Sequence, residues 1–449
     1  MRIEKIHLVG VGVFKDTEIE FSKDHNIHIF TGENGSGKTT LLHALTGGFR
    51  TLFREESKIV KSWHNIENSY ISIKTNKEII FIANEKNKLH GNFQDEIGVI
   101  PIPIMHMEQG NKVFLKQTSV YSKVKNKNNS EASEYIKKIF NYKIDNLFSF
   151  IALSYSGNRS FRAYNLSDGI TEIKNSPFEN ILDFDKSISS DLIIQWIANN
   201  FSKKALALAD EEIEEAEIYN QAIQRIEDII SEITNLKIKF KLKRKPILNL
   251  LLLIDETEYD FDVLPDGLKS MIAWIADLLM RMDRIPWVDN RDIFDREFIL
   301  FLDEIDIHLH PSWQRKILIV VQKLFKNAQI FISTHSPFVV GSIEGAKVYI
   351  LDKNGNVKIE DSKAGYRYSF VTDKIFGIND EFDIETEKEL DQFAKLRDEI
   401  YQTEEFENFK EKEEFLNLVN KLTSKSTSLS NLIGREIRQL EKVTGFQIV

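Results

Sequence analysis

A glycine-rich segment near the N-terminus constrains this chain more than any other feature. The run Gly32-Glu33-Asn34-Gly35-Ser36-Gly37-Lys38-Thr39 matches the pattern G-x-x-x-x-G-K-[S/T] at every position. It follows an apolar run at 27–30, typical of a buried strand, and precedes a segment at 38–53 whose apolar residues favour a helix. Glycines let a backbone wrap an anion, and the N–H groups at a helix start attract phosphate oxygens. The pattern therefore predicts a nucleotide phosphate site.

Most residues of this loop and the residue after it are expected to bind the nucleotide. They are Gly32, Asn34, Gly35, Ser36, Gly37, Lys38, Thr39 and Thr40. Lys38 would add positive charge at the outer phosphates, and the Thr39 hydroxyl can ligate Mg²⁺. ATP and Mg²⁺ are therefore the expected cofactors.

A site of this kind also needs a carboxylate for the metal and usually a base for the attacking water. Asp303 and Glu304 directly follow the apolar run 298–302. We expect Asp303 to hold Mg²⁺ together with Thr39, and Glu304 to orient and deprotonate the water. His335 ends a second apolar strand pattern and is expected to contact the terminal phosphate.

Composition narrows the setting of this site. The chain has 449 residues, enough for two to four units of roughly 150 residues. It has no cysteine, which excludes disulfides and thiolate zinc sites and fits a reducing compartment. The net charge is -10, so any contact with nucleic acid must be a local patch. The most apolar stretch, 247–254, is far shorter than the roughly 20 residues of a membrane span. Because the N-terminus also lacks a signal-peptide core, we expect a cytoplasmic protein without a membrane partner.

These segments together resemble the ABC-type ATPases of the SMC and RecF class. The run 302–311, with Ser333-Thr334-His335-Ser336-Pro337, is similar in particular to the AAA-class members common in bacterial defence systems. The resemblance implies an α/β fold: an ABC-type P-loop NTPase core with an inserted helical lobe and a C-terminal helical extension. It also implies head-to-tail dimers around ATP and places Asp306 in the D-loop, which crosses the dimer interface. By the same likeness His308 and His310 are sequence around the D-loop rather than a metal pair.

In this class a signature loop completes the ATP site of the partner subunit. The matching run here is 264–270, and its expected trans-acting residues are Leu264, Asp266, Gly267 and Lys269. Pro265 replaces the usual serine and removes a hydroxyl that would touch the trans γ-phosphate. Leu166-Ser167-Asp168-Gly169 is a closer string match, but no apolar helix follows it, so we interpret it as chance.

The Q-loop contains no glutamine at its expected place. Tyr155 and Arg159 match the Tyr-x-x-x-Arg segment of the defence ATPases, where Arg159 would serve the nucleotide or the lobe interface. Gln109 is a weaker substitute.

The patterns divide the chain into four parts. We expect ATPase core at 1–156 and 264–360, a helical lobe at 157–263, and a helical tail for oligomerisation or partner docking at 361–449. The tail has helical stretches around 386–420 and 428–441. Its stripe of Leu390, Phe393, Leu396 and Ile400 must be buried, against the chain's own core, a neighbouring subunit or an effector.

Three further segments give local expectations. Apolar residues from Ile213 to Ile233 predict one amphipathic helix of about 30 residues, packed on its lobe or protruding toward a partner. Segment 236–243 alternates apolar residues with lysines, which predicts a lysine-guarded edge strand or a phosphate-contact face. Segment 111–133, rich in Lys, Asn and Ser, is expected to be a surface loop.

Over the whole chain, the size and the acidic tail without a nuclease domain resemble the ATPase subunits of the Septu defence systems, the PtuA proteins. This resemblance implies a homo-oligomer built from dimers that controls a separate HNH nuclease. A sister family, the ATPase of the PARIS systems, works with a Toprim effector. Two other hypotheses stay open: a scaffold that binds ATP as a regulatory ligand, and a RecF-like repair ATPase with Lys237 to Lys245 as its DNA face.

Overall fold

The computed structural model describes most of the chain. The described residues are 1–50, 70–76, 79–83, 102–105, 117–121, 143–144, 147–157, 159, 161–162, 166, 169–184, 186, 188–376, 382–403 and 405–448. They form two compact units, Met1–Val371 and Thr372–Val449. Within these residues, no helix combines the length and the apolar character needed to cross a membrane.

A six-stranded, mostly parallel sheet is the centre of the first unit, with the order β10-β14-β15-β3-β16-β17. Its strands are β3 (Ile27–Gly32), β10 (Ile151–Tyr155), β14 (Phe298–Leu302), β15 (Gln329–Ser333), β16 (Ala346–Leu351) and β17 (Val357–Asp361). All neighbours run parallel except β17, which is antiparallel to β16. Every residue of β10, β14 and β15 is buried, as expected for apolar runs inside a parallel sheet. The carboxyl ends of β3, β10, β14 and β15 therefore meet at one edge.

A second, antiparallel sheet has the order β2-β1-β4-β5-β7-β6. Its strands are β1 (Ile3–Val11), β2 (Phe14–Glu20), β4 (Tyr70–Thr75), β5 (Ile79–Ala83), β6 (Ile102–Met105) and β7 (Gln117–Tyr121). The surface-loop prediction for 111–133 is therefore wrong at β7, and the rest of that segment lies outside the described residues. A short hairpin pairs β8 (Lys143–Ile144) with β9 (Leu147–Phe148).

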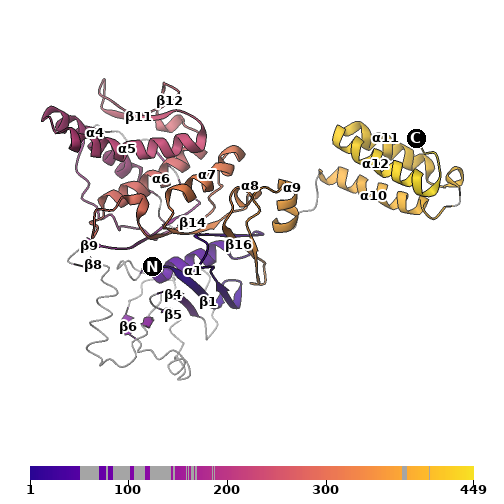
Figure 1. Cartoon of the computed structure of the whole chain (residues 1–449), viewed down its shortest axis with the longest axis horizontal. Helices are drawn as coiled ribbons and strands as arrows, with labels where there is room; N and C mark the ends of the chain where they lie inside the picture. The colour runs from indigo at the N-terminus through magenta and orange to yellow at the C-terminus, as the bar shows by residue number, and fades with distance from the viewer. Residues whose placement is uncertain are drawn as a thin grey trace. The chain divides into compact units, whose positions relative to one another are not determined.

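Helix α1 (Lys38–Arg50) contacts β3 and β15 of the central sheet and β4 and β5 of the second sheet. Its apolar residues Leu41, Leu42, Ala44 and Leu45 are fully buried, which fixes the helix between the two sheets (Figure 1). The predicted helix after the loop is thus confirmed to Arg50.

The segment between the two halves of the core contains helices and a small sheet. Its elements are α4 (Ser190–Ala209), α5 (Ile213–Thr234), β11 (Ile238–Lys243), β12 (Asn249–Ile254) and β13 (Thr257–Tyr259). Helix α6 (Asp266–Arg284) follows and is buried over most of its length. In Figure 1 these elements gather beside α6 on the magenta side of the first unit.

Helix α5 packs on its own lobe. It contacts α4, α6, β11 and α7 (Pro311–Leu324), and it buries Ile226, Ile230 and Ile233. Its length is 22 residues, so the prediction of about 30 was too long. The helix ends because Asn235 adopts a left-handed conformation and caps it.

Strand β11 forms the edge of the small sheet, which has the order β11-β12-β13. Two lysines of the alternating segment form ion pairs with glutamates of the β12–β13 hairpin. Lys237 Nζ lies 2.7 Å from Glu256 Oε1, and Lys241 Nζ lies 2.6 Å from Glu258 Oε1. These pairs favour the guarded-edge interpretation, because they offset charges that a phosphate-contact face would leave free.

The second unit contains α10 (Ile384–Ile400), α11 (Lys412–Lys425) and α12 (Thr427–Thr444). The helical stretch predicted around 386–420 corresponds to α10 and α11, and the stretch predicted around 428–441 corresponds to α12. The predicted stripe is buried inside this unit, where Phe393, Leu396 and Ile400 pack with Phe415 and Ile433. The tail thus has its own apolar core.

The remaining short elements connect these parts. They are α8 (Pro337–Val340), α9 (Tyr368–Val371), η2 (Phe261–Val263), η3 (Ile293–Asp295), η4 (Thr372–Phe376) and η5 (Phe406–Asn408).

Candidate nucleotide site

The glycine-rich loop connects β3 to α1 at the carboxyl edge of the central sheet. Gly37 has a φ of +92°, and a Cβ there would lie 2.7 Å from Val13 Cγ2 and 2.9 Å from Phe14. Gly32 has a φ of +140°, and its Cβ would lie 2.1 Å from the Leu351 carbonyl oxygen. Only glycine fits both positions, because the backbone is left-handed and the neighbours leave no room.

Two observations show that this loop fits a phosphate group. The Ser36 hydroxyl is buried and has no hydrogen-bond partner among the described residues. Lys38 Nζ donates to the carbonyl oxygens of Gly32 and Glu33, each at 2.9 Å, so the cation lies across the loop. Burial lowers the pKa of Lys38, while the carboxylates of Asp303, Glu304 and Asp306 oppose that shift. An anion in the loop would give the Ser36 hydroxyl a hydrogen-bond partner and would offer Lys38 an oxygen that carries a negative charge.

The predicted metal ligands meet at the ends of α1 and β14. Thr39 Oγ1 lies 3.0 Å from Asp303 Oδ2 and 3.2 Å from Asp303 Oδ1. Ser333, at the end of β15, donates its hydroxyl to Asp303 Oδ1 and accepts a hydrogen bond from the Glu304 N–H at 2.8 Å. The role of Ser333 in orienting Asp303 was not predicted; its place at the end of a strand adjacent to β14 was the available signal.

Mg²⁺ suits this pair of ligands. It keeps several waters and binds through one or two protein groups together with phosphate oxygens. Across the described residues, no group of three or more His, Asp or Glu side chains could form a protein metal cage. His308 and His310 therefore form no such cluster, and the His310 ring instead accepts from the Ser312 N–H at the start of α7.

Glu304 lies in an unusual backbone conformation beside the loop. Its φ is +45°, which is uncommon for a residue other than glycine and is often found at functional sites. Its carboxylate lies against Gly157, where a Cβ would be 2.6 Å from Glu304 Oε2.

The loop, Glu304 and His335 line one hollow of about 360 Å³, which we call the phosphate hollow. Its lining consists of Gly12, Val13, Asn34, Gly35, Gly37, Lys38, Thr39, Thr40, Glu304 and His335. Burial, and then the nearby Lys38, lower the pKa of His335, which favours a neutral imidazole. The contribution of Gly12 and Val13 was not predicted, because the turn between β1 and β2 has no phosphate motif.

The signature residues lie outside the phosphate hollow. Gly267 is buried near the start of α6, and a Cβ there would lie 2.4 Å from the His308 carbonyl oxygen. Asp266 is exposed beside it, Leu264 is buried, and Lys269 Nζ donates to the Asp262 carbonyl oxygen at 2.7 Å. Asp306 also lies outside and accepts a hydrogen bond from the Thr334 hydroxyl. The structure thus brings the signature start next to the D-loop.

The residues predicted for the Q-loop do not line the phosphate hollow either. The Tyr155 hydroxyl donates to Asp277 Oδ2 at 2.9 Å, and Arg159 donates to backbone carbonyls behind Glu304. Gln109 lies outside the described residues, as do Ser167 and Asp168 of the chance signature match.

Comparison with known proteins identifies the family of this chain. A family model for the AAA ATPase domain matches residues 1–340. The chain belongs to this family. The retron Ec83 probable ATPase of Escherichia coli is 25% identical over 419 residues, which cover 84% of this chain and 76% of that protein. Septu protein PtuA of Bacillus thuringiensis is 31% identical over 104 residues, which cover 23% of this chain and 26% of PtuA.

A solved structure of an SMC head bound to the C-winged helix domain of ScpA aligns with a TM-score of 0.42 and 15% identity, covering 80% of this chain and 97% of that chain. The resemblance to PtuA is confirmed, while the likeness to retron ATPases was not predicted.

Proposed function

We propose that this protein binds ATP with Mg²⁺ and hydrolyses it slowly. The observation that supports this best is the convergence of Lys38, Thr39, Glu304 and His335 on one hollow, although they come from three separate parts of the chain. Lys38 and the loop N–H groups would bind the outer phosphates. Thr39 and Asp303 would hold the metal, which supplies charge neutralisation at the phosphates when bound. Glu304 would accept the proton of the attacking water, and His335 would contact the terminal phosphate.

Calorimetry and a turnover assay test this proposal. Lys38→Ala should abolish most ATP binding, because only backbone donors would then face the phosphates. Glu304→Gln should bind ATP normally and lose turnover by about 10²- to 10⁴-fold, as expected for a lost general base. Unchanged ATP affinity in Lys38→Ala would refute the phosphate site. A wild-type protein that binds ATP without turnover would instead support the regulatory-ligand hypothesis, which Pro265 favours.

We further propose that two subunits bind head to tail around ATP. Asp266 and Pro265 are exposed at the start of α6, outside the subunit's own phosphate hollow, so they are free to face the nucleotide of a second copy. Glu304→Gln with ATP should therefore form a dimer in light scattering, and Asp266→Arg should prevent it, because the larger side chain at this exposed position would obstruct the close approach of the second copy. Pro265→Ser should raise turnover by restoring a hydroxyl donor.

The biological role that we propose is control of a nuclease in a bacterial anti-phage defence complex in the cytoplasm. The support is the similarity to a Septu protein PtuA and to a retron ATPase. We favour an oligomer of dimers with a separate HNH nuclease subunit. Co-purification of the native operon, followed by mass measurement, tests this role. A Toprim partner would indicate a PARIS-like system, and the absence of any nuclease would favour a RecF-like repair ATPase that binds DNA.

A further inference from the structure

The segment that follows β10 packs against the backbone of Asp303 and Glu304, the two residues that follow β14. The Asp303 N–H donates to the Tyr155 carbonyl oxygen at 2.8 Å, which extends the pairing of β10 with β14 by one residue. Two residues later, the Gly157 backbone lies against the Glu304 carboxylate. Arg159 Nη2 then donates to the Glu304 carbonyl oxygen at 2.7 Å and to the Asp303 carbonyl oxygen at 3.3 Å. We call Tyr155, Gly157 and Arg159 the 155–159 clamp.

Burying the Arg159 guanidinium costs folding free energy that a side chain with a purely space-filling role would not require. It is 5% exposed, and its Nε and Nη1 have no hydrogen-bond partner among the described residues. Burial lowers its pKa to about 10, so the guanidinium stays charged at neutral pH. An incompletely paired buried cation costs free energy that an apolar side chain of similar volume would avoid. Its charge is offset by the carboxylates of Asp303, Asp306 and Glu304, which lie near it.

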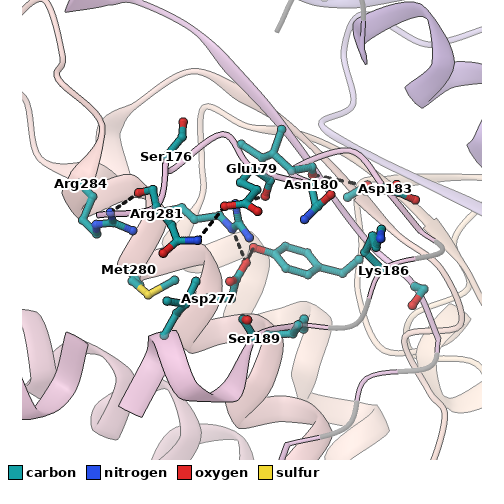
Figure 2. A pocket seen from close by; sticks show the side chains of 17 residues that line it. Ser176, Glu179, Asn180, Asp183, Lys186, Ser189, Asp277, Met280, Arg281 and Arg284 are labelled. Carbon is teal, nitrogen blue, oxygen red and sulfur yellow. Dashed lines mark hydrogen bonds and ion pairs between the residues drawn. The ribbon is translucent and has the colours of Figure 1, made fainter. Parts of the chain in front are cut away.

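The other end of the clamp is fixed to α6. The Tyr155 hydroxyl donates to Asp277 Oδ2 at 2.9 Å, and Arg281 Nε donates to the same oxygen at 2.6 Å. Arg281 also donates to the carbonyl oxygens of Pro177 and Glu179, each at 2.8 Å. Figure 2 shows Asp277 and Arg281 side by side in the polar pocket that these residues line with Tyr155. Asp277 is 1% exposed, so this anchor lies inside the protein.

We propose that Arg159 is a positioning residue for Glu304: by binding the carbonyls of Asp303 and Glu304 it sets the direction of the Glu304 carboxylate, while Asp277 fixes the clamp through Tyr155. The inference rests on the proposed ATPase function and adds a residue that acts from behind the site. From the sequence, Arg159 was expected to serve either the nucleotide or the lobe interface, and its contacts within the described residues are with neither the phosphate loop nor a nucleotide-facing surface. The guanidinium binds the backbone of the catalytic strand end, and it is not among the residues that line the phosphate hollow.

Steady-state kinetics of the full chain test this role. Arg159→Met should lower kcat by about 10²-fold, the loss expected when a catalytic group is misplaced by about 1 Å. ATP affinity and KM should stay within about threefold of wild type, because the phosphate contacts are untouched. Arg159→Lys keeps the cation and should recover part of kcat. Tyr155→Phe removes only the hydroxyl bond to Asp277 and should cause a smaller loss. Arg162→Met is the matched control, since Arg162 is exposed in the same segment.

A double variant separates positioning from structural damage. If Arg159 acts through Glu304, then Arg159→Met combined with Glu304→Gln should be no slower than Glu304→Gln alone. Additive losses, an unchanged kcat, or a fall in ATP affinity as large as the fall in kcat/KM would each overturn the proposal. If the wild-type protein binds ATP but does not hydrolyse it, both the hydrolysis proposal and the positioning role of Arg159 are refuted. Normal ATP binding by Lys38→Ala would instead refute the assignment of the glycine-rich loop as the phosphate site.

Discussion

Thr39 Oγ1 lies 3.0 Å from Asp303 Oδ2, although 264 positions separate the two residues in sequence. The contact forms because β3 and β14 flank β15 in one parallel sheet, so that the residues following their carboxyl ends meet at the same edge. A hydroxyl and a carboxylate at this spacing suit a shared Mg²⁺ with phosphate oxygens as further ligands.

This pair predicts how ATP binding depends on the metal. Asp303→Asn should weaken Mg²⁺-dependent ATP binding by at least about tenfold, while binding of ATP in excess chelator should be unchanged. Calorimetry with and without Mg²⁺ measures both values. Equal losses under the two conditions would indicate that Asp303 supports the loop rather than the metal.

Gly157 predicts a steric effect on turnover. Gly157→Ala would place a Cβ 2.6 Å from Glu304 Oε2, so the carboxylate must move. We expect kcat to fall by about 10²-fold with ATP affinity retained. Gly434→Ala is the control, because its Cβ would have no neighbour nearer than Arg438 Nη1 at 3.5 Å. Full activity in Gly157→Ala would show that Glu304 works from another position.

His28 predicts a loss of stability in acid. Its ring is buried among Phe21, Phe331 and Tyr349, and burial lowers its pKa to about 3. As pH falls below about 6.5, the unfolded chain takes up a proton that the folded chain refuses, so stability decreases toward pH 3. At pH 4.5 this one group should cost about 2 to 3 kcal/mol relative to pH 7.

The matching variant is His28→Phe, which should remove that part of the pH dependence. Urea unfolding of wild type and variant at pH 7 and pH 4.5 measures the difference. Identical pH dependence in the two proteins would contradict a neutral buried His28.

The lysines beside β11 give a prediction about DNA. Lys239 and Lys243 are exposed, whereas Lys237 and Lys241 are paired with glutamates. If the strand is a guarded edge, Lys239→Gln with Lys243→Gln should leave DNA binding and its salt dependence unchanged. A phosphate-contact face would instead lose up to about 1.8 from the salt slope, at roughly 0.9 per contact.

The tail predicts a separable function. Because the second unit begins at Thr372 and buries its own apolar core, truncation after Val371 should leave ATP binding intact. We expect the truncated protein to lose higher oligomers or the nuclease partner, as light scattering and co-purification would show. Retention of both the assembly mass and the partner would limit the tail to a passive extension.

Short contiguous motifs in the sequence predicted which residues the structure brings together. The phosphate loop, Asp303, Glu304 and His335 were predicted, and the structure brings the loop, Glu304 and His335 to one hollow, with Asp303 bonded to Thr39. Arg159 was singled out only by resemblance, and its contact with the Glu304 carbonyl could not be foreseen. That contact exists because β10 pairs with β14, and strand pairing between distant segments leaves no local pattern.

Errors in the sequence reading have the same physical origin. A periodic apolar stripe shows that a helix face is buried but not what covers it. The stripe containing Phe393 and Ile400 is covered by α11 and α12 of its own unit, where a subunit contact was a leading alternative. The length of α5 was overestimated, although its end agrees with the last residue of the predicted stripe, Ile233. The helix begins only at Ile213, because α4 ends at Ala209 and a separate helix precedes the turn.

Helix α6 connects the signature loop to the buried anchor of Tyr155. Its first turn contains Gly267, beside the exposed signature loop, and its middle contains Asp277, which anchors Tyr155 behind Glu304. A packed helix transmits displacement along its axis with little bending, since hydrogen bonds between successive turns and close packing on its sides keep it rigid. In a head-to-tail dimer, the signature end of α6 would face the nucleotide of the other subunit. A displacement of that end would then also shift Asp277, and through Tyr155 the position of Glu304 in the same subunit. Hydrolysis at one ATP site would then depend on the nucleotide bound at the other, so that ATP binding would couple the two subunits.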